Sequence, residues 1–174
     1  MPQDLQDIYS DYLIAQNPHA TATGLSSLLP DELSHDKVTR FLNGKLLDSK
    51  ALWQEVKSDV RRHESLDDGV LILDDMVGEK PYTDENEIIS WHYSHGKGRV
   101  TKGINILSSM VRYDDLSFPT GYEIIKKEIQ FCDIKTKRER RKSAVTKNEH
   151  FRQLLSNALH NRVKYKYVLG QIQV

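Results

Sequence analysis

Two adjacent carboxylates follow four consecutive aliphatic residues in the stretch Val70–Asp75, and the candidate chemistry of the chain is centred on them. The unbroken aliphatic run predicts a buried strand covered on both faces, as in a sheet flanked by helices. Successive side chains of a strand point to opposite faces, so only one of Asp74 and Asp75 can share a site with a neighbouring strand. We expect this strand to end at the acids, with residues 76–78 closing it.

The segment before this strand predicts four helices. Apolar residues recur every three or four positions over residues 4–16, 21–29, 34–43 and 49–63. The third of these helices carries Lys37 and Arg40 on its outer side and follows a short helix and a turn. That outline is typical of a helix-turn-helix unit that binds a DNA groove, although a purely structural bundle produces the same pattern. Both alternatives stay open for the helical segment of residues 1–65.

Three further strands and one helix are expected after the first strand. Large apolar and β-branched residues predict strands over residues 103–113 and 122–127, with a polar connection before them and glycine-bearing loop sequence near residues 95–98. Strands joined without an intervening helix indicate an antiparallel meander. Thr146 and Glu149 form a capping box for a helix that reaches Leu159, and an alternating strand follows over residues 163–169.

The charge is balanced overall and concentrated locally. The chain has 25 Lys and Arg residues against 25 Asp and Glu residues, so no global field attracts it to nucleic acid or membrane. Residues 135–142 hold six cations around one acid, which predicts a solvated, mobile segment able to neutralise phosphates. The candidate phosphate contacts outside the helices are Lys97, Arg99, Lys102, Lys137, Arg138, Arg140 and Arg141.

Other site classes have little support. His92 and His95 are three residues apart, but no further His or Cys accompanies them as a metal pair would need. The single cysteine excludes an internal disulfide framework and a cysteine-based zinc site. No apolar stretch approaches the roughly 20 residues that span a bilayer, and the first residues lack a secretion signal. We therefore expect a soluble, cytoplasmic protein without a membrane partner.

Several motifs in order carry a family resemblance. They are Leu73–Asp75, Glu79–Asn86, Trp91–His95, Lys102–Asn105, Gly121–Lys127 and Lys164–Leu169. With these motifs the chain resembles the cut-and-paste DDE transposases of bacterial insertion sequences, from the N-terminal helices to Leu169. The resemblance implies an α+β or α/β protein in which residues 1–65 form a helical, possibly DNA-binding segment. Residues 66–174 then form the incomplete first half of a ribonuclease H-like mixed sheet.

The resemblance also implies a chemistry. Such transposases hold two divalent ions, normally Mg²⁺, with two Asp and one Glu, because hard cations take oxygen ligands and a metal pair activates the nucleophile and stabilises the leaving oxygen. The first family Asp corresponds to Asp74, as catalytic residue and metal ligand, and Asp75 is the alternative because Met76 stands where the family pattern has Thr. The implied partners are DNA, as transposon ends and target, and a second copy or a full-length transposase.

One departure from the family decides the expected activity. Where family members follow the Val-Leu strand with their second catalytic Asp, this chain has Gly170 and then Gln171–Val174, without an acid. We expect a truncated or frameshifted transposase that is inactive on its own. The alternatives are a DNA-binding module that competes for element ends without catalysis, and an unrelated structural domain whose two acids merely cap a strand.

Overall fold

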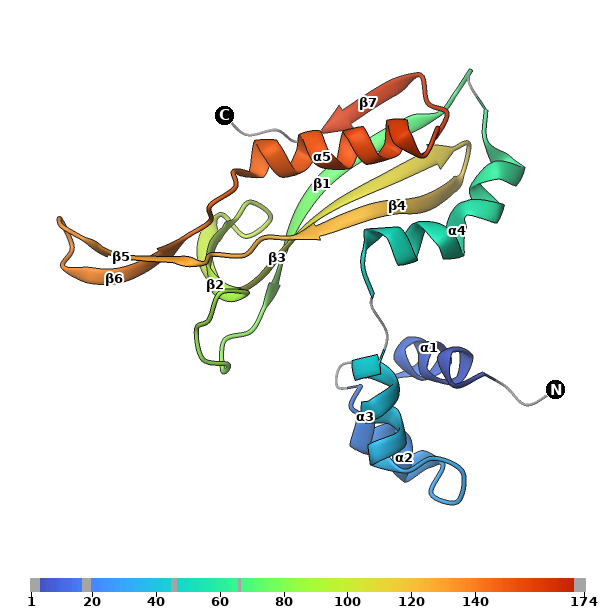
Figure 1. Cartoon of the computed structure of the whole chain (residues 1–174), viewed down its shortest axis with the longest axis horizontal. Helices are drawn as coiled ribbons and strands as arrows, with labels where there is room; N and C mark the ends of the chain where they lie inside the picture. The colour runs from blue at the N-terminus through green and yellow to red at the C-terminus, as the bar shows by residue number, and fades with distance from the viewer. Residues whose placement is uncertain (1–3, 17–19, 45–46, 66, 171–174) are drawn as a thin grey trace. The chain divides into compact units, whose positions relative to one another are not determined.

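The computed structural model describes residues 4–16, 20–44, 47–65 and 67–170. They form two compact units, Met1–Leu47 and Asp48–Val174. The first unit contains three helices, and the second contains two helices, a mixed five-stranded sheet and a two-stranded hairpin (Figure 1). The α+β class with N-terminal helices, expected from the sequence, is confirmed.

The first unit is a small helical bundle. Its helices are α1 (Leu5–Ala15), α2 (Ala22–Leu28) and α3 (His35–Gly44). Tyr12 of α1 packs with Leu25 of α2 and Val38 of α3, and its hydroxyl oxygen accepts a hydrogen bond of 3.1 Å from the backbone N–H of Thr21. The connection between α2 and α3 covers residues 29–34, which is longer than the roughly three- to four-residue turn of a helix-turn-helix.

The helix α4 (Ser49–His63) belongs to the second unit. Asp48 caps it by accepting a 2.7 Å hydrogen bond from the N–H of Ala51, and Ser49 is joined to β4 by the 2.6 Å hydrogen bond that Tyr122 N–H donates to its Oγ. The unit boundary therefore lies between Leu47 and Asp48, one helix earlier than the boundary expected after residue 65. The apolar side of α4 packs against the sheet.

The sheet is built on one long central strand. Its strands are β1 (Val70–Glu79), β2 (Ile89–Ser94), β3 (Arg99–Tyr113), β4 (Leu116–Ile124) and β7 (Tyr167–Gly170). β1 pairs antiparallel with β3 along one of its edges. β2 and β4 pair antiparallel with opposite halves of the other edge of β3. β7 pairs with β1 in parallel. The strand order is β2-β3-β1-β7, with β4 also paired to β3, and this arrangement makes the sheet mixed.

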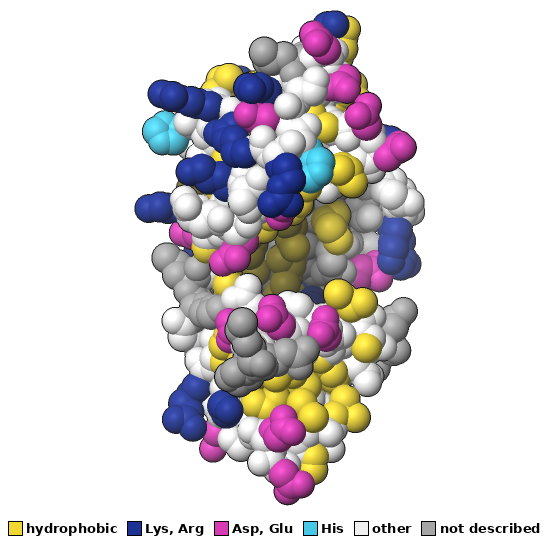
Figure 2. All heavy atoms as spheres, turned by 90° about the vertical axis from the view of Figure 1, so that its right-hand side faces the viewer, with side chains coloured by type: hydrophobic (Ala, Val, Ile, Leu, Met, Phe, Trp, Pro, Cys, Tyr) yellow, Lys and Arg dark blue, Asp and Glu magenta, His cyan; other side chains and the backbone are white. Residues whose placement is uncertain are grey.

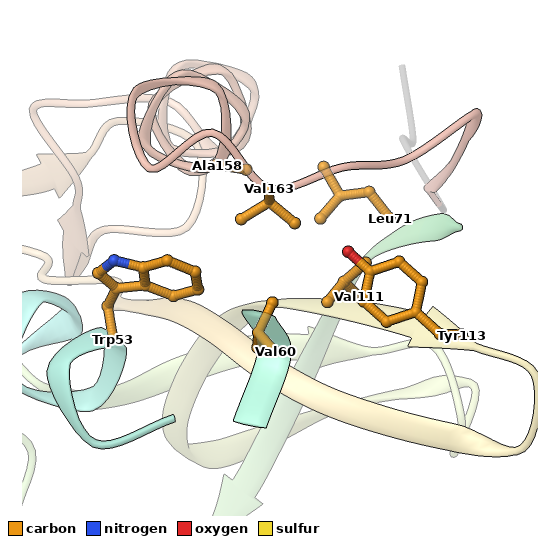
Figure 3. Packing of buried hydrophobic residues seen from close by; sticks show 7 residues of the cluster. All are labelled: Trp53, Val60, Leu71, Val111, Tyr113, Ala158 and Val163. Atoms are coloured by element: carbon orange, nitrogen blue, oxygen red, sulfur yellow. The ribbon is translucent and has the colours of Figure 1, made fainter. Parts of the chain in front are cut away.

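One face of the sheet packs against α4 and α5 (Lys147–His160). Side chains from both helices and from β1 and β3 converge in one cluster (Figure 3), which consists of Trp53, Val60, Leu71, Val111, Tyr113, Ala158 and Val163. A second cluster joins Leu73 and Leu107 to Phe151 and Leu154 of α5. The capping box predicted at Thr146 and Glu149 is present and starts α5.

The strand β1 differs from the expectation in two ways. It does not end at the acids but continues through Asp74 and Asp75 to Glu79, because β3 is long enough to pair with all ten of its residues. Nor is it covered on both faces: Leu71 and Leu73 are buried under the helices, while Val70 and Ile72 on the opposite face are only half-buried. The aliphatic run reflects one packed face and one partly shielded face.

Two segments form strands that the sequence did not predict. Trp91 lies in β2, whose four-residue turn at 95–98 leads directly into β3. The basic segment forms β6 (Arg138–Lys142), which pairs with β5 (Ile129–Asp133) in a separate hairpin, so the prediction of a mobile segment is wrong. The hairpin turn is fixed by Asp133, whose Oδ1 accepts hydrogen bonds from Lys135 N–H at 2.9 Å and Thr136 N–H at 3.2 Å.

The surface shown in Figure 2 carries Lys and Arg side chains together with Asp and Glu side chains on each unit, in keeping with equal totals of both signs. None of the helices in the described ranges is both long and apolar enough to cross a bilayer.

Candidate carboxylate site and nucleic-acid interface

The two central acids of β1 lie on opposite faces of the sheet. Asp75 shares the helix-covered face with Leu71 and Leu73, and only 11% of its side chain is exposed. Asp74 lies on the other face and is exposed, and its Oδ1 accepts a 2.8 Å hydrogen bond from the backbone N–H of Asp75. This alternation confirms that one site can use only one of the two carboxylates.

Asp75 is the carboxylate that other elements surround. Lys147, in the first turn of α5, donates a hydrogen bond from its Nζ to Asp75 Oδ2. Asn105 of β3 is fully buried and directs its Nδ2 towards the same oxygen at 3.5 Å and towards the carbonyl oxygen of Met76 at 3.4 Å. The sequence-based preference for Asp74 thus falls on the acid without such neighbours, and the alternative falls on the acid within a polar cluster.

A buried histidine lies in the same region of the sheet face. His92 of β2 is 5% exposed, and its Nε2 lies 3.2 Å from the Oγ of Ser90. Burial is the main cause that lowers the pKa of His92 from 6.5 to about 4, with the charges of Lys127 and Lys147 acting in the same direction and Asp75 opposing them. His92 is therefore neutral at physiological pH. His95 lies in the turn after β2 and packs its ring against Tyr93.

The residues around Asp75 do not fit a pair of Mg²⁺ ions. Two Mg²⁺ ions require several oxygen ligands, and carboxylates supply most of the protein's share. Within the described residues no three His, Cys, Asp or Glu side chains gather at a metal-binding distance. The nearest charged neighbour of Asp75 is a cation, Lys147, which neutralises the carboxylate that a metal would use. We therefore derive no metal-dependent step at this site.

Buried oxygen atoms accompany the cluster. Thr101 Oγ1 and Asn105 Oδ1 are buried and have no hydrogen-bond partner among the described protein atoms. Both residues lie on β3 and face the same side as Asp75 and His92, because the register pairs His92 with Thr101 and Asp75 with Leu107. Polar groups therefore extend from the centre of β1 to β2.

The predicted phosphate contacts near the β2–β3 turn are partly neutralised. Lys97 Nζ lies 2.9 Å from Glu79 Oε2, and Arg99 lies 3.5 Å from the other oxygen of the same carboxylate. These cations lower the pKa of Glu79, the hydrogen bond from Lys97 being the largest cause. Lys102 lies on β3 opposite Trp91. The net charge left for a phosphate is smaller here than the sequence suggested.

The predicted contacts of the basic segment are held by the hairpin. Arg138 and Arg140 share one face of β6, Arg141 lies on the other face, and Lys137 is in the turn with a φ of 52°. Arg140 Nε lies 3.2 Å from Asp133 Oδ2 across the hairpin. Lys37 and Arg40, in contrast, are exposed on α3 in the helical unit.

A groove joins the hairpin to the sheet. Its lining includes Arg138, Arg140 and Arg141 from β6, Phe131 from β5, Trp91 and Tyr93 from β2, and Lys127, and its volume is about 580 Å³. We define this surface as the aromatic-basic groove. The sequence identified its arginines but not its aromatic side, because the hairpin fold-back that brings Phe131 near Trp91 follows no local motif.

Comparisons with known proteins leave this geometry to be interpreted by itself. No protein-family model, curated protein or solved structure matches the chain.

Proposed function

We propose that this chain binds DNA as a protein of the insertion-sequence transposase type and does not cleave DNA on its own. The observation that most directly supports DNA binding is the row of cations on β6. The hairpin orders these cations instead of leaving them in a mobile tail. Ordered cations lose less conformational entropy when they contact phosphates. The antiparallel pairing of β1 with β3 and of β3 with β4, followed by β7 parallel to β1, supports the transposase type, since the resemblance implies a mixed sheet.

The lack of cleavage follows from the surroundings of Asp75. A two-metal nuclease needs carboxylates around its ions, whereas Asp75 is bound by Lys147 and Asn105 and lies on the opposite face from Asp74. Such a protein would occupy element ends without processing them, and would compete there with a full-length transposase or act as a dimer with it.

DNA binding is tested by fluorescence anisotropy with a labelled duplex at several salt concentrations. We expect the logarithm of the association constant to fall linearly with the logarithm of the salt concentration, by about 0.9 for each phosphate neutralised. The double variant Arg138→Gln/Arg141→Gln should reduce this slope by about 2. Arg62→Gln, an exposed cation of α4 outside the hairpin, is the matched control and should leave it unchanged. Binding that ignores both salt and the double variant contradicts the proposal.

Cleavage is tested with supercoiled plasmid and Mg²⁺ or Mn²⁺. We expect no conversion to nicked or linear DNA above the level of a protein-free reaction. Metal-dependent nicking that disappears in Asp75→Ala or Asp74→Ala, but persists in Asp67→Ala, would overturn the non-catalytic part of the proposal. Asp67 is exposed and lies before β1, so this control removes an acid without altering β1.

A further inference from the structure

The aromatic side chains of the aromatic-basic groove are unusually exposed for their size. Trp91 is 51% exposed, Tyr93 is 49% exposed and Phe131 is 40% exposed. Strand alternation explains the first two, because buried Ser90 and His92 take the helix-covered face of β2 and leave Trp91 and Tyr93 on the other face. Aromatic surface that is gathered in one place and left in water is typical of a binding site.

Cations line the same groove. Arg138, Arg140 and Arg141 of β6 and Lys127 of the segment after β4 line it, together with two acids, Glu85 and Glu139. Lys127 is fixed there because its Nζ donates a 2.5 Å hydrogen bond to the carbonyl oxygen of Trp91. The excess of positive charge favours an anionic occupant.

Aromatic rings and cations also contact one another at the hairpin. Lys142 Nζ lies 5.6 Å from the centre of the Phe131 ring, and Phe131 pairs directly with Arg140 across the hairpin. In Figure 1 the hairpin of β5 and β6 extends from the sheet next to β2. The groove therefore offers aromatic rings from β2 and β5 together with guanidinium groups from β6.

We propose that the aromatic-basic groove binds a single-stranded segment of nucleic acid. Bases would stack on Trp91 and its aromatic neighbours, and the phosphates would contact the arginines of β6. Only unpaired bases can present their faces to a tryptophan, because in a duplex those faces are covered by neighbouring base pairs. The combination of a positive groove with exposed rings is the usual surface for single strands. This inference rests on the proposed DNA-binding function and specifies the form of the ligand.

The test compares an oligo-dT of about 12 nucleotides with a duplex of the same length, using anisotropy and intrinsic fluorescence. Trp53 is buried, so quenching by the oligonucleotide reports mainly on Trp91. We expect quenching by oligo-dT, and an affinity for it that falls at least about tenfold in Trp91→Ala while the affinity for duplex stays within about twofold. Trp91→Phe should retain most of the affinity, because it keeps a stacking ring.

Controls separate stacking from charge and from misfolding. Tyr82→Ala removes a fully exposed aromatic outside the groove and should change nothing. Arg141→Gln should weaken single-stranded and duplex DNA alike. Circular dichroism of Trp91→Ala is expected to match that of the unmodified protein, since the side chain is half in solvent, and the quenching of the unmodified protein tests the proposal without any variant.

The outcomes distinguish this inference from the proposed function. Salt-dependent duplex binding without quenching, or with equal losses for both ligands in Trp91→Ala, overturns the single-strand inference and leaves DNA binding intact. Binding of neither ligand contradicts both the single-strand inference and the proposed DNA-binding function. Quenching by an acidic peptide but not by oligo-dT also overturns the inference, because the groove then takes a protein. Quenching by oligo-dT or by oligo-U supports it, and the stronger of the two identifies the strand as DNA or RNA.

Discussion

Lys147, at the start of α5, forms an ion pair with Asp75, which lies 72 residues earlier in the centre of β1. The pair links the first turn of the helix to the middle of the sheet, and Asn105 of β3 adds a third element. The side chain of Asp75 is 11% exposed and that of Lys147 is 38% exposed, so solvent screens the pair only in part. This relationship makes Asp75 a structural carboxylate in the described chain.

Removing Lys147 should therefore destabilise the second unit. We expect Lys147→Ala to lower the free energy of unfolding by about 1–2 kcal/mol, because a mostly buried carboxylate loses its counterion. Urea denaturation at neutral pH measures the effect. Lys57→Ala, an exposed lysine of α4, should change the free energy by less than about 0.5 kcal/mol. Equal values for the two variants would contradict the structural role.

The stability should fall as the pH is lowered from 7 to 4. The pKa of His92 is about 4 in the folded protein, against 6.5 ordinarily, so between these values the unfolded chain binds the proton and the folded chain does not. Full loss over this window amounts to about 3 kcal/mol. Urea denaturation at several pH values should show it, with a flatter profile for His92→Gln and an unchanged profile for the exposed control His95→Gln. Identical profiles for all three proteins would exclude a buried neutral His92.

Gly103 should be intolerant of even a methyl group. A Cβ there would lie 2.2 Å from the carbonyl oxygen of Gly78 and 3.0 Å from the Cα of Glu79, and both atoms belong to the backbone of β1. We expect Gly103→Ala to destabilise the protein by about 2–3 kcal/mol, since two paired strands must move apart. The matched control is Gly96→Ala, where no atom lies within 4 Å. Thermal unfolding followed by circular dichroism compares them, and similar midpoints would argue against this close approach.

The capping box of α5 should contribute a measurable share of stability. Thr146 Oγ1 accepts a 3.2 Å hydrogen bond from Glu149 N–H, and Glu149 Oε2 accepts a 2.7 Å bond from Thr146 N–H. We expect Thr146→Ala to cost about 1 kcal/mol and Thr146→Ser to restore most of it, because serine keeps the hydroxyl. Chemical denaturation of the three proteins measures this, and an alanine variant as stable as the serine variant would contradict it.

Prediction from the sequence succeeded where the signal was local. The start of α5 was predicted because both members of its capping box lie within four residues. The glycine loop near residues 95–98 is a turn as expected, but the strand around Trp91 was not predicted, since its alternation became a strand only through pairing with β3. The mobility predicted for the basic segment was wrong for the same reason. Its six cations favour solvation, but β5 supplies a pairing partner and Asp133 fixes the turn.

The sequence by itself determined the helices, the central aliphatic strand, the acids within it and the positions of the cations, because periodicity and composition act over a few residues. Only the tertiary structure decided that Asp75 and not Asp74 lies beside Lys147, and that Phe131 and Trp91 line one groove. Those outcomes depend on strand register and on the packing of α5, and a shift of one residue in register would reverse the face of every side chain in β1.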